Sequence, residues 1–162
     1  MKAAIGASPL IYLTKIGRLD VLAQYEEILV PPEVLAEIER GRRTGHMEAL
    51  GVRRLVEGGR LRVRKSGRPH AEWNLDPGET TVLTLALRAR VDEVVTNDRA
   101  AIAVAKYLGL RPVSVLFLLF RERRSGRMTQ EAFEGTLRRL LSATYYLSPE
   151  LHHRLVEAGR EP

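Results

Sequence analysis

The sequence contains no cysteine among its 162 residues. Disulfide-stapled scaffolds, zinc fingers, iron–sulfur centres and thiol nucleophiles are therefore excluded. A chain without cysteine also fits the cytoplasm, where disulfides are rare, and we expect a cytoplasmic protein.

Long apolar runs are lacking as well. The longest segment without a charged residue spans residues 3–14, whereas a membrane-spanning helix needs about 18 apolar residues. Ser8-Pro9 interrupts this segment and charged residues follow it, so we expect it to belong to the fold rather than to a signal peptide. No membrane partner is expected.

Lysine and aspartate are scarce, whereas arginine is abundant. Only four of the 26 basic residues are lysines, and the formal net charge is +6. The planar guanidinium matches phosphate, so this bias favours a nucleic-acid partner. Genomic base composition or thermal adaptation explains the same bias equally well. With 44% hydrophobic and 28% charged residues, the composition is that of a globular domain and excludes a wholly disordered chain.

Strand and helix patterns alternate along the chain. Short strands are predicted at Lys2–Gly6, Glu27–Val30, Arg60–Lys65, Glu93–Thr96 and Leu110–Ser114. Helices are predicted at Pro9–Ala23, Pro31–Gly41, Thr44–Glu57, Gly78–Arg90, Arg99–Leu108, Val115–Arg124, Thr129–Ser142 and Ser148–Ala158, with Gly159 as the C′ glycine of the last one. This alternation indicates an α/β fold, in which helices cover both faces of one parallel sheet. In such folds ligands bind beyond the carboxyl ends of the strands.

Three acidic residues stand near predicted strand ends. Asp98 follows the strand Glu93–Thr96, Glu79 lies in the first turn of the helix before that strand, and Glu37 lies on the helix after the strand Glu27–Val30. Carboxylates that converge from separate elements supply the oxygen ligands that Mg²⁺ or Mn²⁺ takes. Such an ion can activate water for attack on a phosphodiester.

Each of these acids also has a purely structural interpretation. Asp98 or Asn97 fits a helix N-cap, and Glu79 fits a capping box with Asp76. Glu37 fits a solvated position on its helix. From spacing alone the structural interpretations are the commoner outcome.

Five parts of the chain, spread over nearly its whole length, together resemble one known family. They are Ala7–Asp20, Val30–Ile38, Pro77–Glu79, Thr96–Ala101 with Ala105–Leu110, and Leu147–Leu151 with Ala158-Gly159. These motifs are similar to those of PIN-like nucleases, in the branch related to VapC-type toxins. The resemblance implies a three-layer α/β/α fold with a central parallel sheet. It implies a PIN-like domain over residues 1–127 and a C-terminal helical extension, residues 128–162, packed on the same domain.

The resemblance also implies a site. In PIN domains a cluster of carboxylates surrounds Mg²⁺ or Mn²⁺ at the carboxyl edge of the sheet. Matched by motif, the second, third and fourth acids fall on Glu37, Glu79 and Asp98, with Ser8 as a polar neighbour of the metal. The first acid, an aspartate, should follow the first strand, but this chain has Gly6 there.

The family therefore implies a metal-dependent endoribonuclease, weakened at Gly6, that acts as the toxin of a toxin–antitoxin pair. Its partners would be single-stranded or structured RNA and an antitoxin protein, and PIN proteins commonly form homodimers. The alternative is a catalytically inactive PIN-like module that binds RNA or protein, and the glycine at position 6 favours that alternative.

Basic side chains are the candidates for RNA contacts. Arg60, Arg62 and Arg64 alternate with apolar residues along one predicted strand, so their side chains should share one face. We predict that these three and Arg99 contact phosphates. Charge that protects an edge strand from pairing with another chain is the competing explanation for the strand arginines. The apolar run Phe117–Phe120 is expected in the core or at a dimer face.

Overall fold

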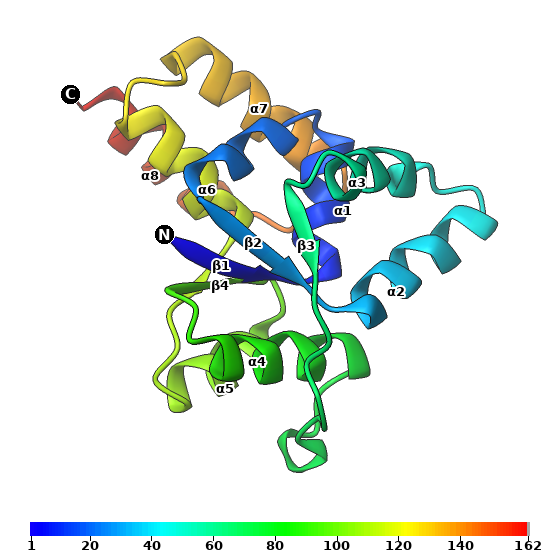
Figure 1. Ribbon diagram of the computed structural model, residues 1–162. Coiled ribbons are helices and arrows are strands. Elements are labelled where there is room, and N and C mark those ends of the chain that lie inside the picture. The colour runs from blue at the N-terminus through cyan, green and yellow to red at the C-terminus, as the bar shows by residue number, and fades with distance from the viewer. Residues whose placement is uncertain (162) are drawn as a thin grey trace.

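The computed structural model describes residues 1–161 and contains one five-stranded sheet (Figure 1). Its strands are β1 (Lys2–Ile5), β2 (Glu27–Val30), β3 (Leu61–Val63), β4 (Glu93–Val95) and β5 (Pro112–Val113). They lie in the order β3-β2-β1-β4-β5, and all neighbours are parallel. All carboxyl ends therefore meet at one edge.

The central strand β1 explains why the sheet is covered on both faces. Its residues Ala3, Ala4 and Ile5 are fully buried. A continuous apolar run is what a strand needs when both of its faces pack against helices. Two alanines in the middle of the sheet also let the helices approach closely.

Helices form a layer on each side of the sheet (Figure 1). On one side lie α4 (Pro77–Ala89) and α5 (Arg99–Tyr107); on the other lie α1 (Ala7–Lys15), α3 (Glu48–Glu57) and α6 (Val115–Arg124). Helix α2 (Pro32–Arg43) contacts α1 and α3 as well as α4. The predicted α/β/α fold is confirmed. Within residues 1–161, no helix combines the length and apolarity that crossing a membrane requires.

The C-terminal helices α7 (Gln130–Ser142) and α8 (Pro149–Arg160) pack against α6. Phe133, Leu137 and Leu140 are fully buried and belong to the same core as the sheet. Gly159 does not follow α8 as predicted but lies inside it. A Cβ on Gly159 would lie 3.1 Å from the ring of Phe133, so close packing of α8 on α7 explains the glycine.

Two predicted helix boundaries were wrong for the same reason. The first helix ends at Lys15 rather than Ala23, because Gly17 adopts a φ of +67°; a 3₁₀ helix, η1 (Leu19–Gln24), follows it. The predicted helix Thr44–Glu57 starts only at Glu48, after Gly45 turns the chain with a φ of +96°. Glycine is the residue that adopts this left-handed conformation at little cost. A second 3₁₀ helix, η2 (Ala71–Trp73), precedes α4.

The apolar run Phe117–Phe120 lies mostly in the core. Leu118 and Leu119 are fully buried, whereas Phe117 is 41% exposed. Homodimer formation stays a prediction.

Candidate functional site

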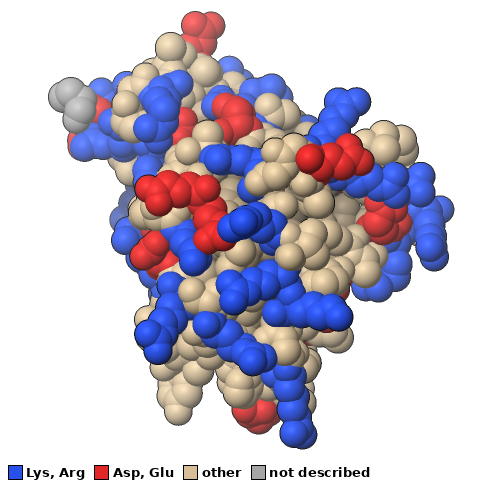
Figure 2. All heavy atoms as spheres, in the orientation of Figure 1, with Lys and Arg blue, Asp and Glu red and all other residues tan. Residues whose placement is uncertain are grey.

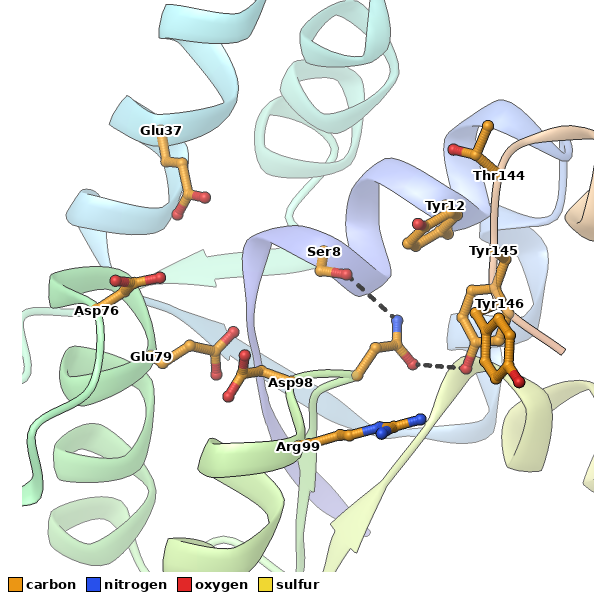
Figure 3. A pocket seen from close by; sticks show the side chains of 11 residues that line it. Ser8, Tyr12, Glu37, Asp76, Glu79, Asp98, Arg99, Thr144, Tyr145 and Tyr146 are labelled. Atoms are coloured by element: carbon orange, nitrogen blue, oxygen red, sulfur yellow. Dashed lines mark hydrogen bonds between the residues drawn. The ribbon is translucent and has the colours of Figure 1, made fainter.

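A cavity of about 460 Å³ opens at the carboxyl edge of the sheet. We call it the acidic pocket (Figure 3). It is lined by Ser8, Tyr12, Glu37, Asp76, Glu79, Asn97, Asp98, Arg99, Thr144, Tyr145 and Tyr146. It thus contains the three acids and the serine that the motifs single out, although they come from four separate elements.

Parallel strand topology brings the acids together. Ser8 lies in the first turn of α1, directly after β1, and Asp98 lies between β4 and α5. Glu37 lies on α2, which follows β2, and Glu79 lies in the first turn of α4. Figure 3 shows the carboxylates of Glu37, Glu79 and Asp98 directed toward the same space, with that of Asp76 beside them. Asp76 is an acid of this pocket that the motif comparison missed.

Gly78 allows α2 and α4 to approach one another at the pocket. A Cβ at this position would lie only 2.8 Å from Oε2 of Glu37. The glycine before Glu79 therefore leaves room for the carboxylate of the neighbouring helix.

Asp98 has the capping role considered from the sequence and also lines the acidic pocket. It is the N-cap of α5, because its Oδ1 accepts a hydrogen bond from the backbone N–H of Ala101 at 2.7 Å. Its own N–H donates to Oγ1 of Thr96 at 3.2 Å. These bonds fix the carboxylate at the rim of the acidic pocket, with Oδ2 outside the cap.

Glu79 is held by a partner outside its own helix. Asp76 makes no side-chain capping bond at the start of α4, so the capping box predicted with Glu79 does not form. Instead, Oε2 of Glu79 accepts a hydrogen bond from the hydroxyl of Thr96 at 3.0 Å. The buried Thr96 thereby links Glu79 to Asp98.

The acidic pocket raises the pKa of Glu79 to about 7. Burial of the carboxylate is the main cause, and the negative charges of Asp98, Glu37 and Asp76 add to it. The hydrogen bond from Thr96 acts in the opposite direction but is outweighed.

Glu93 is a buried carboxylate of the same protein whose negative charge is balanced by a neighbouring arginine. It lies at the opposite, amino edge of the sheet and is fully buried. Burial alone would raise its pKa, but hydrogen bonds from Arg121 and Tyr25 outweigh burial and hold the pKa of Glu93 below its usual range. No cation forms an ion pair with Glu79 in the part of the chain that the structure describes, although Arg99 lines the same pocket.

None of the ion pairs within residues 1–161 involves Glu37, Asp76, Glu79 or Asp98. An all-oxygen set of uncompensated carboxylates is the chemistry that a hard divalent cation takes. The donor set therefore fits Mg²⁺ or Mn²⁺. Across the same residues, however, no three acidic or histidine side chains are already grouped as a coordination cluster.

Gly6 lies where a further carboxylate would complete the pocket. Its backbone N–H extends the sheet by donating to the carbonyl of Val95 at 3.0 Å. A Cβ on Gly6 would lie 3.1 Å from Oε1 of Glu79. A side chain at position 6 would thus project directly toward the acids, and this chain has none.

Asn97 organises the side of the pocket away from the acids. Its Nδ2 donates to the hydroxyl of Ser8 at 3.5 Å. Its Oδ1 accepts from the backbone N–H of Val115 at 3.1 Å and from the hydroxyl of Tyr145 at 3.3 Å. The sequence pattern indicated Asn97 only as a helix cap and gave no signal for the tyrosines, because no short-range pattern links Tyr145 to a site almost 50 residues earlier.

The predicted RNA-contacting arginines are divided between two places. Arg99 lines the acidic pocket and takes part in no ion pair within residues 1–161. Arg60, Arg62 and Arg64 do not line it, and they lie on or beside β3, an edge strand. Figure 2 shows basic side chains scattered over the face that carries β3, with acidic ones between several of them.

The three strand arginines also do not form the uniform row that the alternation predicted. The guanidinium of Arg60 donates to the backbone carbonyls of Leu22 and Tyr25, each at 2.8 Å. Arg62 forms an ion pair with Glu27 at 2.6 Å. The side chain of Arg64 is exposed to solvent. Val63, predicted on the buried face, is 46% exposed because β3 is short and at the edge. RNA contact by these arginines stays a prediction.

We expect Glu79→Gln to stabilise the metal-free protein at pH 8 but not at pH 5. The folded-state pKa of about 7 exceeds the ordinary value of 4.5, so the folded chain binds the proton more tightly than the unfolded chain. The free energy of unfolding therefore falls as pH rises from about 4.5 to about 7. Glutamine removes this loss, which is roughly 2–3 kcal/mol, and should raise the Tm at pH 8 by roughly 5–10 °C.

Thermal melts in EDTA at both pH values provide the measurement. Glu131→Gln, an exposed glutamate in the first turn of α7, is the matched control and should shift the Tm little at either pH. An equal effect of Glu79→Gln at both pH values would show that Glu79 does not carry the raised pKa.

Comparison with known proteins agrees with this geometry. No curated protein matches the sequence. A family model described as PIN domain matches residues 2–161, almost the whole chain. The motifs, the parallel α/β/α fold and this match together show that the chain belongs to the PIN domain family.

Proposed function

We propose that the protein is a metal-dependent endoribonuclease whose acidic pocket holds Mg²⁺ or Mn²⁺. The observation that carries this proposal is the set of carboxylates around Glu79, none of which forms an ion pair within residues 1–161; burial and these neighbouring charges raise the pKa of Glu79 to about 7. A protein tolerates such repulsion most readily where a cation relieves it. PIN domains generally use divalent metal ions, and most of the family's acidic positions are occupied here.

Glu37, Glu79 and Asp98 would hold the ion, with the hydroxyl of Ser8 as a neutral oxygen beside it. A divalent ion there supplies an activated water and stabilises the charge that develops on the phosphodiester. The chain positions its own ligands through hydrogen bonds: Thr96 holds Glu79, and the N–H of Ala101 holds Asp98. Asn97 holds Ser8.

Arg99 is suited to hold the substrate's phosphate backbone. It stands at the start of α5, beside the acids, and none of the described carboxylates pairs with it. Its guanidinium is therefore available to donate two hydrogen bonds to one phosphate group. Arg62 and Arg64 lie outside the pocket. They would contact the phosphates of the same RNA molecule only if it extends from the pocket to β3.

Cleavage of a labelled mixed-sequence single-stranded RNA tests the proposal. We expect cleavage with Mn²⁺ or Mg²⁺ and none with EDTA. Glu37→Gln should slow it roughly tenfold or more, because a charged ligand is lost. Glu131→Gln on the distant helix α7 should cleave like the wild type. Cleavage that persists in EDTA, or that Glu37→Gln leaves intact, would contradict the proposal.

The second candidate is a PIN-like module that binds RNA or protein without cutting. Gly6 favours it, because the pocket lacks one carboxylate and its acids are not preassembled as a cluster. Tight RNA binding without cleavage at any metal concentration would identify this case. The toxin role and the antitoxin partner stay predictions, which a small antitoxin-like reading frame beside the gene would support.

A further inference from the structure

Aromatic side chains from distant parts of the chain meet at one side of the acidic pocket. Tyr12 comes from α1, whereas Tyr145 and Tyr146 come from the segment between α7 and α8. Figure 3 shows them together, across the pocket from Glu37 and Glu79. The pocket therefore has an acidic side and an aromatic side, with Ser8 between them.

Tyr145 is partly buried and anchors this segment. Its ring packs edge-to-face on Tyr12, with centroids 4.9 Å apart and an angle of 80° between the planes. Its hydroxyl donates to Asn97. The preceding Thr144 has a φ of +64°, a conformation that costs a β-branched residue free energy. The chain is thus held in an unfavourable turn that brings two consecutive tyrosines to the pocket.

Of the three tyrosines that line the pocket, Tyr146 is the one whose ring does not pack against another of them. It lines the pocket, yet its side chain is 78% exposed. No aromatic pair or hydrogen bond within residues 1–161 involves it. An aromatic ring exposed at the mouth of a polar cavity offers an open π face, which is what an unpaired base stacks on.

We infer that Tyr146 forms a stacking subsite for one unpaired base of a single-stranded RNA, whose backbone passes Arg99 to reach the acids. This inference rests on the proposed function, since it specifies the substrate of the same site. A cavity of about 460 Å³ lies within the range that accommodates a small organic ligand, roughly 300–1,000 Å³. The subsite selects single strands because in a duplex both faces of each base are already stacked.

The test compares binding of two short RNAs with the same number of phosphates, one with its bases and one abasic throughout. Binding is measured by fluorescence anisotropy with Ca²⁺ in place of Mn²⁺, so that cleavage is suppressed. The wild type should bind the RNA with bases roughly tenfold more tightly than the abasic RNA, because stacking of one base on an aromatic ring increases affinity by about this factor. Tyr146→Ala should abolish this difference and leave the affinity for the abasic RNA unchanged.

Two control variants separate stacking from other effects. Tyr146→Phe keeps the ring and should keep the difference between the two RNAs. Tyr107→Ala removes a tyrosine that is 89% exposed on α5 and does not line the pocket, and should behave like the wild type. Equal affinity of the wild type for both RNAs, or a difference that survives in Tyr146→Ala, would overturn the subsite.

A parallel cleavage assay in Mn²⁺ distinguishes failure of the subsite from failure of the proposed function. Wild-type cleavage with no effect of Tyr146→Ala on either binding or rate would reject the subsite and leave the nuclease intact. Base-dependent binding through Tyr146 without cleavage would reject the nuclease and keep the subsite. A wild type that binds neither RNA would reject both.

Discussion

Asp98→Asn should lower metal-dependent RNA cleavage roughly 100-fold or more, because it removes one charged ligand from a pocket that already lacks the carboxylate of position 6. The fold should survive the change. Asparagine caps helices about as well as aspartate, so the bond from the N–H of Ala101 that starts α5 is retained. The substitution therefore removes a charge and little else.

The matched control for Asp98→Asn is Asp92→Asn. Asp92 also precedes a secondary-structure element, and its carboxylate accepts a hydrogen bond from the backbone of Lys2 at the amino edge of the sheet. It should leave cleavage unchanged. Cleavage rates at saturating Mn²⁺, together with the Tm of each variant, complete the measurement. Full activity of Asp98→Asn with normal stability would remove Asp98 from the site.

Gly6→Asp should raise both metal affinity and cleavage, by roughly tenfold or more, because a fourth carboxylate would be added beside the ion. The backbone permits the change: Gly6 has a φ of −86° and a ψ of 175°, an extended conformation that any residue adopts. Its Cβ would lie 3.1 Å from Oε1 of Glu79, so the new carboxylate points at the acids. The same proximity should lower the Tm of the metal-free variant.

Gly6→Asn is the control for size, because it has nearly the same shape and no charge. Titration of Mn²⁺, with thermal melts in EDTA and in Mn²⁺, should show tighter binding and a larger metal-induced rise in Tm only for the aspartate. Adding Asp98→Asn to Gly6→Asp should cancel the gain in cleavage. If Gly6→Asp and Gly6→Asn behave alike, position 6 does not contribute to a metal site.

The sequence was enough to predict the fold class and the main elements, because periodicity and capping are local properties. Val115–Arg124 was predicted with the observed bounds, and the helices predicted to begin at Thr129 and Ser148 begin one residue later, with these two residues as their N-caps. The errors at Ala23 and Thr44 arose where a glycine adopted a positive φ, which composition alone does not reveal. Gly159 was misassigned because its role is to pack against another helix.

For the pocket, the resemblance to the family pointed to Ser8, Glu37, Glu79 and Asp98, and all four line the same cavity. Which other residues join them depends on contacts between segments distant in sequence. Only the tertiary structure could place Tyr145 and Tyr146 against Tyr12, or direct Gly6 toward Glu79. It also decided the charge balance: Glu93 is paired with Arg121, whereas Glu79 is partly buried among acids and forms no ion pair within residues 1–161. A local pattern selects the type of residue, but burial and partners, which set its pKa and its accessibility, exist only in the folded chain.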